Sequence, residues 1–145
     1  MEEQNTLINF NLSGISTEQY AVIPELYKED ETIGFNVEIK YAVNIEDKII
    51  VINTKCSFVQ NDIPFLIIEI ANHFSIQPIS FASFIDDEAK IITIPSNFAA
   101  HLVLLTIGTT RGVLHAKVEN TQFNQFIIPT INLAELVKEP IVITY

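Results

Sequence analysis

The sequence predicts an α+β fold, in which an antiparallel sheet of about four long strands carries a long helix and a short C-terminal helix packed on one face. Three observations predict it. Residues 35–76 read as long strands separated by tight turns, residues 96–112 carry the strongest helical pattern, and a short capped helix begins near residue 132. Strands grouped first and helices grouped last are typical of this class. At 145 residues, the chain is expected to form a single domain, residues 1–145, with a substantial core.

The first part of the chain is predicted to be extended but interrupted. Leu7–Ile15 reads as a strand, Gly14 and the residues after it break the alternation, and Tyr20–Ile23 reads as a second, short strand before a proline. The segment Lys28–Thr32 is expected to be a charged loop.

A meander of three long strands is predicted next. Between Phe35 and Ile45 apolar and polar residues alternate, as in a strand with one face in water. Ile49–Phe58 is a second run rich in β-branched residues, and Phe65–Ile76 is a third. Turns at Glu46-Asp47 and at residues 60–62 connect the three.

Around the helices the local signals are shorter. Gln77–Ala89 is expected to be irregular, Ile91–Ile94 to be a short extended piece, and Ser96 to cap the long helix. After the helix and a loop, Asn132 with a glutamate three residues later resembles a capping box that opens the short helix. Ile141–Tyr145 has β-propensity.

The long helix has more apolar surface than one protein face covers. Between Phe98 and Ile107 only His101 and Thr106 are polar, and a helix that is apolar all round is buried on more than one side. Because most soluble oligomers are symmetric homo-oligomers, a second copy of the chain is the simplest partner. The row expected at this interface is Phe98, Leu102, Leu105, Thr109 and Gly112.

Two glycines, Gly108 and Gly112, support the same interpretation. Each costs about 0.8–1 kcal/mol relative to alanine inside a helix, so a helix that continues through them suggests that another backbone approaches closely there. The alternative is that one of the glycines ends the helix. We favour continuation through Gly108 and leave Gly112 open.

Composition and charge exclude several classes of protein. The net charge of −10 argues against nucleic acid and anionic membranes as partners, since both carry phosphate groups. With 48% hydrophobic residues, the chain is not of the disordered class. The acidic start Met1-Glu2-Glu3 does not resemble a signal peptide, no apolar run reaches the length of a membrane span, and Cys56 is the single cysteine. The expected location is the cytoplasm.

The sequence carries no motif for catalysis or metal binding. It has no Gly-rich phosphate loop, no HExxH and no nucleophile elbow. His73, His101 and His115 show no metal-ligand spacing, Cys56 has no evident base and is expected to be a core residue, and Asp86–Glu88 is expected to be a solvated loop. We therefore expect no enzymatic activity, no cofactor and no metal.

Phenylalanine is unusually frequent, with ten copies and no tryptophan. Large apolar side chains in irregular segments either fill the core or line a binding groove. The residues by themselves favour the core. Those in or near irregular segments are Phe74, Phe81, Phe84, Phe123 and Phe126.

Short motifs follow one another in a distinctive order over most of the chain. They are Phe10-Asn11-Leu12, then TEQYAVIPE, Phe74-Ser75-Ile76, Arg111-Gly112, and finally Pro129-Thr130-Ile131-Asn132-Leu133 before Glu135-Leu136. In this order and spacing they resemble the SecB family of export chaperones. The chain as a whole is therefore expected to be a single SecB-like domain.

The resemblance implies an activity and an assembly. Members of the family hold unfolded or partly folded polypeptide clients in apolar surface grooves without ATP, and they assemble as a dimer of dimers with the long helix between dimers. The resemblance thus implies a cytoplasmic holdase that is a homo-oligomer, dimer or tetramer, with a role in protein export. The groove residues expected here are Phe58, Phe65, Phe74, Phe123 and Phe126.

The resemblance also assigns a second partner. Ile67 and Glu69 fall on strand positions where export members meet the translocase motor. The chain departs from the family pattern, because the loop over residues 113–128 is longer, the second helix is shorter and the usual tail is missing. These departures weaken the export role in particular.

Two alternatives remain open. One is a dedicated partner chaperone of one client, such as an antitoxin, because some relatives of the family guard one. The other is a small enzyme or ligand-binding domain of the hot-dog type, which places its long helix between the first strands.

Overall fold

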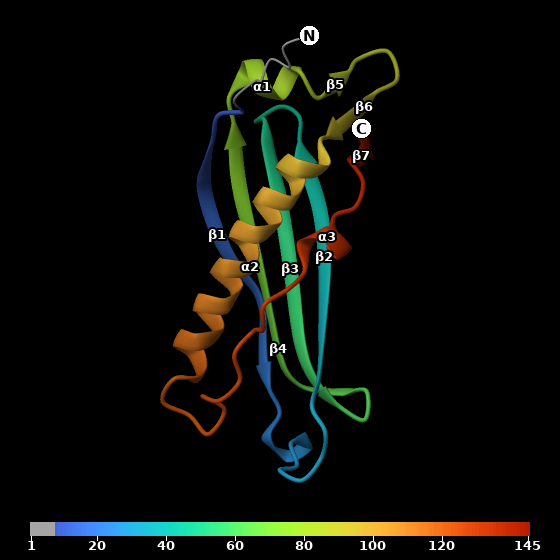
Figure 1. Ribbon diagram of the computed structural model, residues 1–145. Coiled ribbons are helices and arrows are strands. Elements are labelled where there is room, and N and C mark those ends of the chain that lie inside the picture. Colours follow the sequence, from blue (N-terminus) through green and yellow to red (C-terminus); the bar gives the residue numbers. More distant parts are fainter. Residues whose placement is uncertain (1–7) are drawn as a thin grey trace.

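The computed structural model describes residues 8–145. Its elements are shown in Figure 1. In chain order they are β1 (Phe10–Val22), the 3₁₀ helix η1 (Pro24–Leu26), β2 (Gly34–Asn44), β3 (Ile49–Gln60), β4 (Ile63–Ile76), α1 (Pro78–Ala82), β5 (Ile85–Asp86), β6 (Ile91–Ile94), α2 (Ser96–Val118), α3 (Leu133–Leu136) and β7 (Ile141–Thr144).

The main sheet is antiparallel and has the strand order β1-β4-β3-β2. The strands β2, β3 and β4 form the predicted meander, and β1 adds to its β4 edge. The hairpin between β3 and β4 turns over Asn61 and Asp62, whose φ angles are 51° and 62°. Two successive positive φ angles are the signature of a type I′ turn, whose twist matches that of the strands it joins.

β1 is one continuous strand, where the sequence predicted two. Its pairing with β4 shifts register between Leu12 and Gly14 and again between Thr17 and Gln19. Each shift moves the alternation of faces by one residue, so the apolar pattern is broken although the backbone pairing continues. The predicted start of this strand at Leu7 lies outside the described residues.

α2 crosses one face of the sheet obliquely (Figure 1). It runs for 23 residues and continues through both Gly108 and Gly112. The prediction that Ser96 caps it is wrong, because Pro95 holds the N-cap position and no side chain caps the helix. With φ −56° and ψ 143°, Pro95 supplies the extended N-cap geometry, and its carbonyl accepts the N–H of Ala99 at 2.9 Å.

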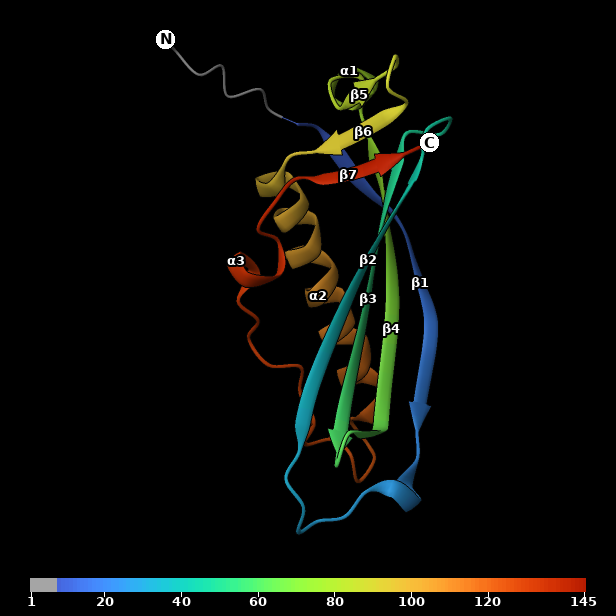
Figure 2. The same ribbon diagram turned by 90° about the vertical axis from the view of Figure 1, so that its right-hand side faces the viewer.

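The C-terminal segment returns along the same face of the sheet. Arg111 on α2 ties it down, since Nε donates to the carbonyl of Ile128 at 2.8 Å and Nη2 to that of Pro129 at 2.9 Å. Asn132 caps α3, as predicted, by accepting the N–H of Ala134 at 3.1 Å. Figure 2 shows α2 and α3 on one side of the sheet, which confirms the predicted arrangement.

A second, smaller sheet lies at one end of the molecule, with the strand order β5-β6-β7. Its central strand β6 pairs with β7, so the last strand of the chain joins the segment that leads into α2. The region Gln77–Ala89, predicted to be irregular, contains α1 and β5 instead. Pro78 begins α1, because its fixed φ suits the first turn of a helix.

The hydrophobic core lies between the main sheet and the helix side of the fold. Ile52 on β3 and Ile68 and Ile70 on β4 are fully buried, as are Leu102 and Val103 on α2. No helix covers the opposite face of the sheet within the described chain (Figure 2). The fold therefore buries one face of the sheet and leaves the other in water.

Candidate binding surfaces

Side chains suited to acid–base or metal chemistry do not converge. His101 packs edge-on against Phe10 with ring centroids 5.8 Å apart, His73 is half-buried on β4, and His115 is exposed. Across residues 8–145, no three histidine, cysteine, aspartate or glutamate side chains gather as metal ligands. The helices of the same range are all too short or too polar to cross a membrane.

Cys56 and the acidic turn have structural roles. Cys56 is fully buried, and desolvation raises the pKa of its thiol to about 12, although the positive charge of Arg111 acts in the opposite direction. Because the thiolate is the nucleophile, this thiol is not prepared for nucleophilic chemistry. Asp86 accepts the backbone N–H groups of Glu88 and Ala89 at 3.1 and 3.2 Å, so its carboxylate shapes an exposed turn.

Four of the five phenylalanines predicted at the client groove come together around Tyr27. In this aromatic cluster, formed by Tyr27, Phe58, Phe65, Phe123 and Phe126, neighbouring ring centroids are 5.1 to 6.5 Å apart. The four phenylalanines are only 0–6% exposed. They fill the interior, as the residues by themselves favoured, and line no open groove in this conformation.

Phe74, the fifth predicted groove residue, lies apart from the aromatic cluster. It is fully buried and packs edge-on against Phe10 with centroids 5.9 Å apart. The aromatic cluster is closed by the loop that carries Phe123 and Phe126, and Gln125 in this loop donates to the hydroxyl of Tyr27 at 3.0 Å. A client reaches these rings only when the loop moves aside, so their role in binding stays a prediction.

The predicted interface row on α2 is divided between two faces. Phe98 and Leu102 are buried against the sheet, whereas Leu105 is 39% exposed, Thr109 is half-buried and Gly112 is exposed. A row with heptad spacing drifts by about 20° per heptad around a straight helix. Over its two heptads the row turns by only about 40°, so it follows the margin between the buried and the exposed face of α2.

The outward face of α2 carries exposed leucines and glycines beside the exposed His101 and His115. Leu104 is 51% exposed and lies next to Leu105. A Cβ atom added to Gly108 or to Gly112 would have no heavy atom within 4 Å, leaving aside the helix's own nearby backbone. These two glycines therefore relieve no crowding within the described chain.

The edge strand β1 continues this apolar face. Asn72 on β4 donates to the hydroxyl of Thr109 on α2 at 3.0 Å. On β1, Asn72 pairs with Ile15, whose side chain is 55% exposed. Leu12, also on β1, is 47% exposed. We name the residues of this outward face and strand edge together the helix–edge surface, which comprises Leu12, Ile15, Leu104, Leu105, Gly108, Thr109 and Gly112.

Further exposed aliphatic residues lie at the end of the sheet that carries η1 and the β3–β4 hairpin; this end is at the bottom of Figure 1. Four large aliphatic side chains in these loops are 37–53% exposed, and we name them together the loop-end surface. They are Ile23, Leu26, Ile33 and Ile63. Sequence analysis missed them, and the available signal was the presence of large aliphatic residues within short polar loops.

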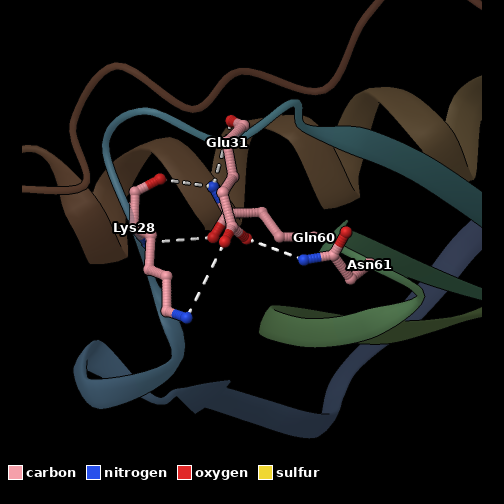
Figure 3. A network of polar contacts seen from close by, with 4 residues as sticks. All are labelled: Lys28, Glu31, Gln60 and Asn61. Atoms are coloured by element: carbon pink, nitrogen blue, oxygen red, sulfur yellow. Dashed lines mark hydrogen bonds and ion pairs between the residues drawn. The ribbon is translucent and has the colours of Figure 1, made fainter.

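A polar network fixes the loop that carries part of this surface (Figure 3). The buried side chain of Gln60 donates to the carbonyls of Lys28 and Glu31 at 2.7 and 3.3 Å and accepts the N–H of Lys28 at 2.9 Å. Asn61 donates to the Glu31 carboxylate at 2.8 Å, and the Lys28 ammonium lies 3.7 Å from the same group. The loop is thereby held against the β3–β4 hairpin.

Ile67 and Glu69 lie on an inner strand of the sheet. Both are half-buried on β4, where Ile67 pairs with Ser57 and Glu69 pairs with Lys55 on β3. Neither belongs to the helix–edge surface or to the loop-end surface. The two residues occupy one face of one strand, as their spacing requires.

The order of elements differs from that of a hot-dog domain. In that alternative the long helix comes between the first strands, whereas α2 follows all four strands of the main sheet. The fold observed here does not have the topology that this alternative predicts.

Comparison with known proteins identifies a likeness in fold. No model of a protein family matches the chain, and no curated protein matches it in sequence. Among solved structures, it is similar to a SecB-like chaperone of Mycobacterium tuberculosis in complex with a ChAD peptide from an antitoxin, at 10% sequence identity and a TM-score of 0.44. The match covers 86% of this chain and 90% of the other. A likeness of this size carries no functional argument, so the surfaces are interpreted from their own residues.

Proposed function

We propose that this protein is a chaperone that self-associates and holds apolar segments of other polypeptides without using ATP. The observation that carries the proposal is the exposure of large aliphatic side chains on two separate surfaces of a chain with net charge −10. Exposed apolar patches mark interaction sites. A high net charge keeps a protein with such patches soluble.

We assign the helix–edge surface to self-association. The two glycines in the middle of α2 cost about 0.8–1 kcal/mol each relative to alanine, and the monomer gains no packing from them. A partner backbone over Gly108 and Gly112 would explain both. Within residues 8–145, β1 is an edge strand of the main sheet, and such edges are normally covered or blocked. The assembly is a dimer or a tetramer.

Holding a client requires no chemistry beyond burial of apolar surface. Each Å² of apolar area removed from water contributes about 25 cal/mol, so a few aliphatic side chains of the client are enough for reversible binding. The aromatic cluster is the proposed deeper part of the client groove, exposed when the loop with Phe123 and Phe126 moves aside. Phe74 supports the sheet under α2.

Aggregation suppression tests the proposal. A chemically denatured client is diluted into buffer with and without this protein, its light scattering is followed, and the mass of the complex is measured by in-line light scattering. We expect suppression at about one client per oligomer. A Leu104→Glu, Leu105→Glu variant should form smaller species, whereas Glu46→Gln, an exposed change elsewhere, should leave the mass unaltered.

The outcomes separate two kinds of chaperone. Suppression of unrelated clients indicates a general holdase. An intact oligomer without suppression contradicts that activity and leaves a dedicated partner, such as one antitoxin, to be sought by pull-down. A monomer without suppression contradicts the whole proposal.

A role in protein export depends on Ile67 and Glu69. If this strand face binds the translocase motor, a variant with Ile67→Ser and Glu69→Lys should lose capture of the purified motor while keeping aggregation suppression. Equal capture by the variant and the unaltered chain would contradict a motor contact at these residues.

A further inference from the structure

We infer that a pocket beside the start of α2 binds a small uncharged molecule that has an apolar body and one hydrogen-bonding group. The pocket lies at the end of the molecule that carries α1, β5 and β6, at the top of Figures 1 and 2. Its volume is about 560 Å³, and small-molecule sites usually measure about 300–1,000 Å³. The pocket shares no residue with the helix–edge surface or the loop-end surface, so the inference goes beyond the proposed chaperone function.

Apolar side chains from separate parts of the chain form one part of the lining. Phe84 is 7% exposed, and its ring centroid lies 5.7 Å from that of Phe98, so this wall of the pocket is anchored in the core. Ile79 on α1 also lines the pocket and, at 87%, is the most exposed large apolar side chain among residues 8–145. Ile8 and Pro95 complete the apolar lining. A ligand that covers Ile79 removes this aliphatic area from water, which favours binding.

Uncharged polar side chains form the rest of the lining. Ser80 lines the pocket and is 8% exposed, and its hydroxyl forms no hydrogen bond within residues 8–145. The carbonyl of the same residue accepts the hydroxyl of Ser83 at 2.5 Å, which holds the backbone in place. Thr93 on β6 and Asn97 on α2 lie in the same lining. A hydroxyl or carbonyl group on the ligand would give Ser80 the partner that buried polar groups normally have.

The lining selects the charge and the size of the occupant. None of the described residues that line the pocket is charged, so an ammonium or carboxylate group would lose its hydration there without gaining an ion pair. The net charge of −10 on the whole chain adds repulsion against an anion. The pocket is compact, whereas an extended polypeptide segment needs a strand edge or a groove that continues along the surface. A small uncharged molecule therefore fits best.

Three compounds with the same apolar body test the inference. They are phenylbutanol, phenylbutyrate and phenylbutylamine, each with the phenyl ring and the polar group at opposite ends of the butyl chain. Binding to the full chain at neutral pH is measured by ligand-detected NMR titration. We expect the alcohol to bind saturably and at least about tenfold more tightly than either ion, because only the ions bury an unpaired charge. Equal affinities for the three compounds would overturn the inference.

A pair of matched variants locates the site. Thr93 is exposed and lines the pocket, so Thr93→Lys puts a long charged side chain beside the bound molecule. This change should weaken phenylbutanol binding by at least about tenfold. The control is Thr144→Lys, the same substitution at an exposed residue of the same small sheet that does not line the pocket. It should leave the affinity unchanged.

Two smaller changes test the polar and the apolar part of the lining separately. Ser80→Ala should weaken phenylbutanol by about fivefold, the effect expected for loss of one neutral hydrogen bond. Ile79→Ser should weaken it by about threefold, because the ligand then buries less aliphatic area. The control for the second change is Val142→Ser, at a position that is 60% exposed and outside the pocket. Circular dichroism of every variant verifies that the fold is retained.

Each outcome has a distinct meaning. The inference is overturned if the unaltered protein does not bind phenylbutanol, or if Thr93→Lys binds it as tightly as the unaltered protein does. Displacement of bound phenylbutanol by a denatured polypeptide shows that the pocket takes clients, and it also overturns the inference. Binding of phenylbutanol by a protein that does not suppress aggregation contradicts the proposed function and supports the small-molecule site, so the two proposals fail independently.

Discussion

Gln60 shows how a single amide holds two distant parts of this chain together. It lies at the end of β3 and is 4% exposed, and its side chain forms hydrogen bonds with backbone groups of residues 28 and 31. Buried amides are stable when their donors and acceptors are paired. The geometry of the loop-end surface therefore depends on this one side chain.

Replacement of Gln60 by leucine should lower the free energy of unfolding by about 1–3 kcal/mol, because it removes the side-chain partner of the partly buried Lys28 N–H and Glu31 carbonyl. The measurement is the urea midpoint, with the slope unchanged. Lys28→Met, which removes only the exposed ion pair with Glu31, should cost less than about 1 kcal/mol. Equal losses in the two variants would contradict this role of Gln60.

Cys56 gives the stability a dependence on alkaline pH. Burial raises the pKa of its thiol from 9.0 to about 12, so the folded chain keeps the proton where the unfolded chain releases it. The contribution of this thiol to the free energy of unfolding is fully present below pH 9. It should decrease between pH 9 and pH 12 by up to about 1.4 kcal/mol per pH unit. Unfolding in urea over this pH range measures the decrease.

The Cys56→Ala variant isolates the thiol. Burial also raises the pKa values of Tyr20 and Tyr41, but these residues act equally in both chains. The stability of the variant should therefore decrease less steeply over the same range. Parallel decreases in the variant and the unaltered protein would show that the thiol does not contribute.

At the scale of an element, α2 has two different faces. Its inner face packs on the sheet, and its outer face remains open. Gly108 and Gly112 lie on the outer face with free space around them. Changing both to alanine should stabilise an isolated chain by about 0.8–1 kcal/mol per site. If a partner backbone lies over them, the same change should weaken the oligomer.

Dilution experiments separate these two effects. Light scattering gives the concentration at which the oligomer dissociates, and urea unfolding at low concentration gives the stability of the dissociated chain. In the double alanine variant we expect the dissociation concentration to rise, and we expect the stability of the dissociated chain to rise as well. A variant that is more stable and associates as tightly as the unaltered protein would place the interface elsewhere.

Arg111 connects α2 to the extended segment that covers part of the sheet. Arg111→Met keeps the apolar stem but removes the donors to the carbonyls of Ile128 and Pro129. The loop over residues 119–128 should then open more often, be cleaved faster by a protease and expose the aromatic cluster. Binding of an apolar peptide should increase.

The control for this change is Lys117→Met, which removes a cation of the same helix that lies 5.4 Å from the centroid of the Tyr20 ring on β1. Its cleavage rate and peptide affinity should remain those of the unaltered protein. Faster cleavage of Arg111→Met without a gain in peptide binding would argue against the aromatic cluster as part of the client groove.

For the whole molecule, net charge and exposed apolar area act against each other. The chain carries a charge of −10 at pH 7 and has a calculated isoelectric point near 4.5. As the pH falls toward that value, repulsion between molecules disappears while the apolar surfaces persist. Particle mass measured by light scattering should rise beyond that of the native oligomer.

The apolar surfaces themselves should control this association. The Leu26→Ser, Ile63→Ser variant has almost the same charge at each pH but less exposed aliphatic area. It should therefore associate at a lower pH than the unaltered protein. Identical association of the two chains would mean that charge loss by itself, and not the loop-end surface, drives the effect.

Local patterns in the sequence determined the meander, the long helix and the class of the fold. Residues 35–76 alternate or are β-branched between recognisable turns, and α2 contains no proline. Period and turn chemistry act over a few residues, so they are visible without distant contacts. The net charge of −10, from which we predict that nucleic acid is not a partner, is likewise a property of composition.

Only the tertiary structure decided which side chains are available for binding. The phenylalanines of the aromatic cluster are buried because a distant loop closes over them, and two of the five residues of the predicted α2 row are buried because the helix lies across the sheet. The continuity of β1 depends on bulges against β4, and the pairing of β6 with β7 joins segments far apart in sequence. The exposure of each side chain depends on contacts between parts of the chain that are far apart in sequence. Local patterns in the sequence do not contain this information.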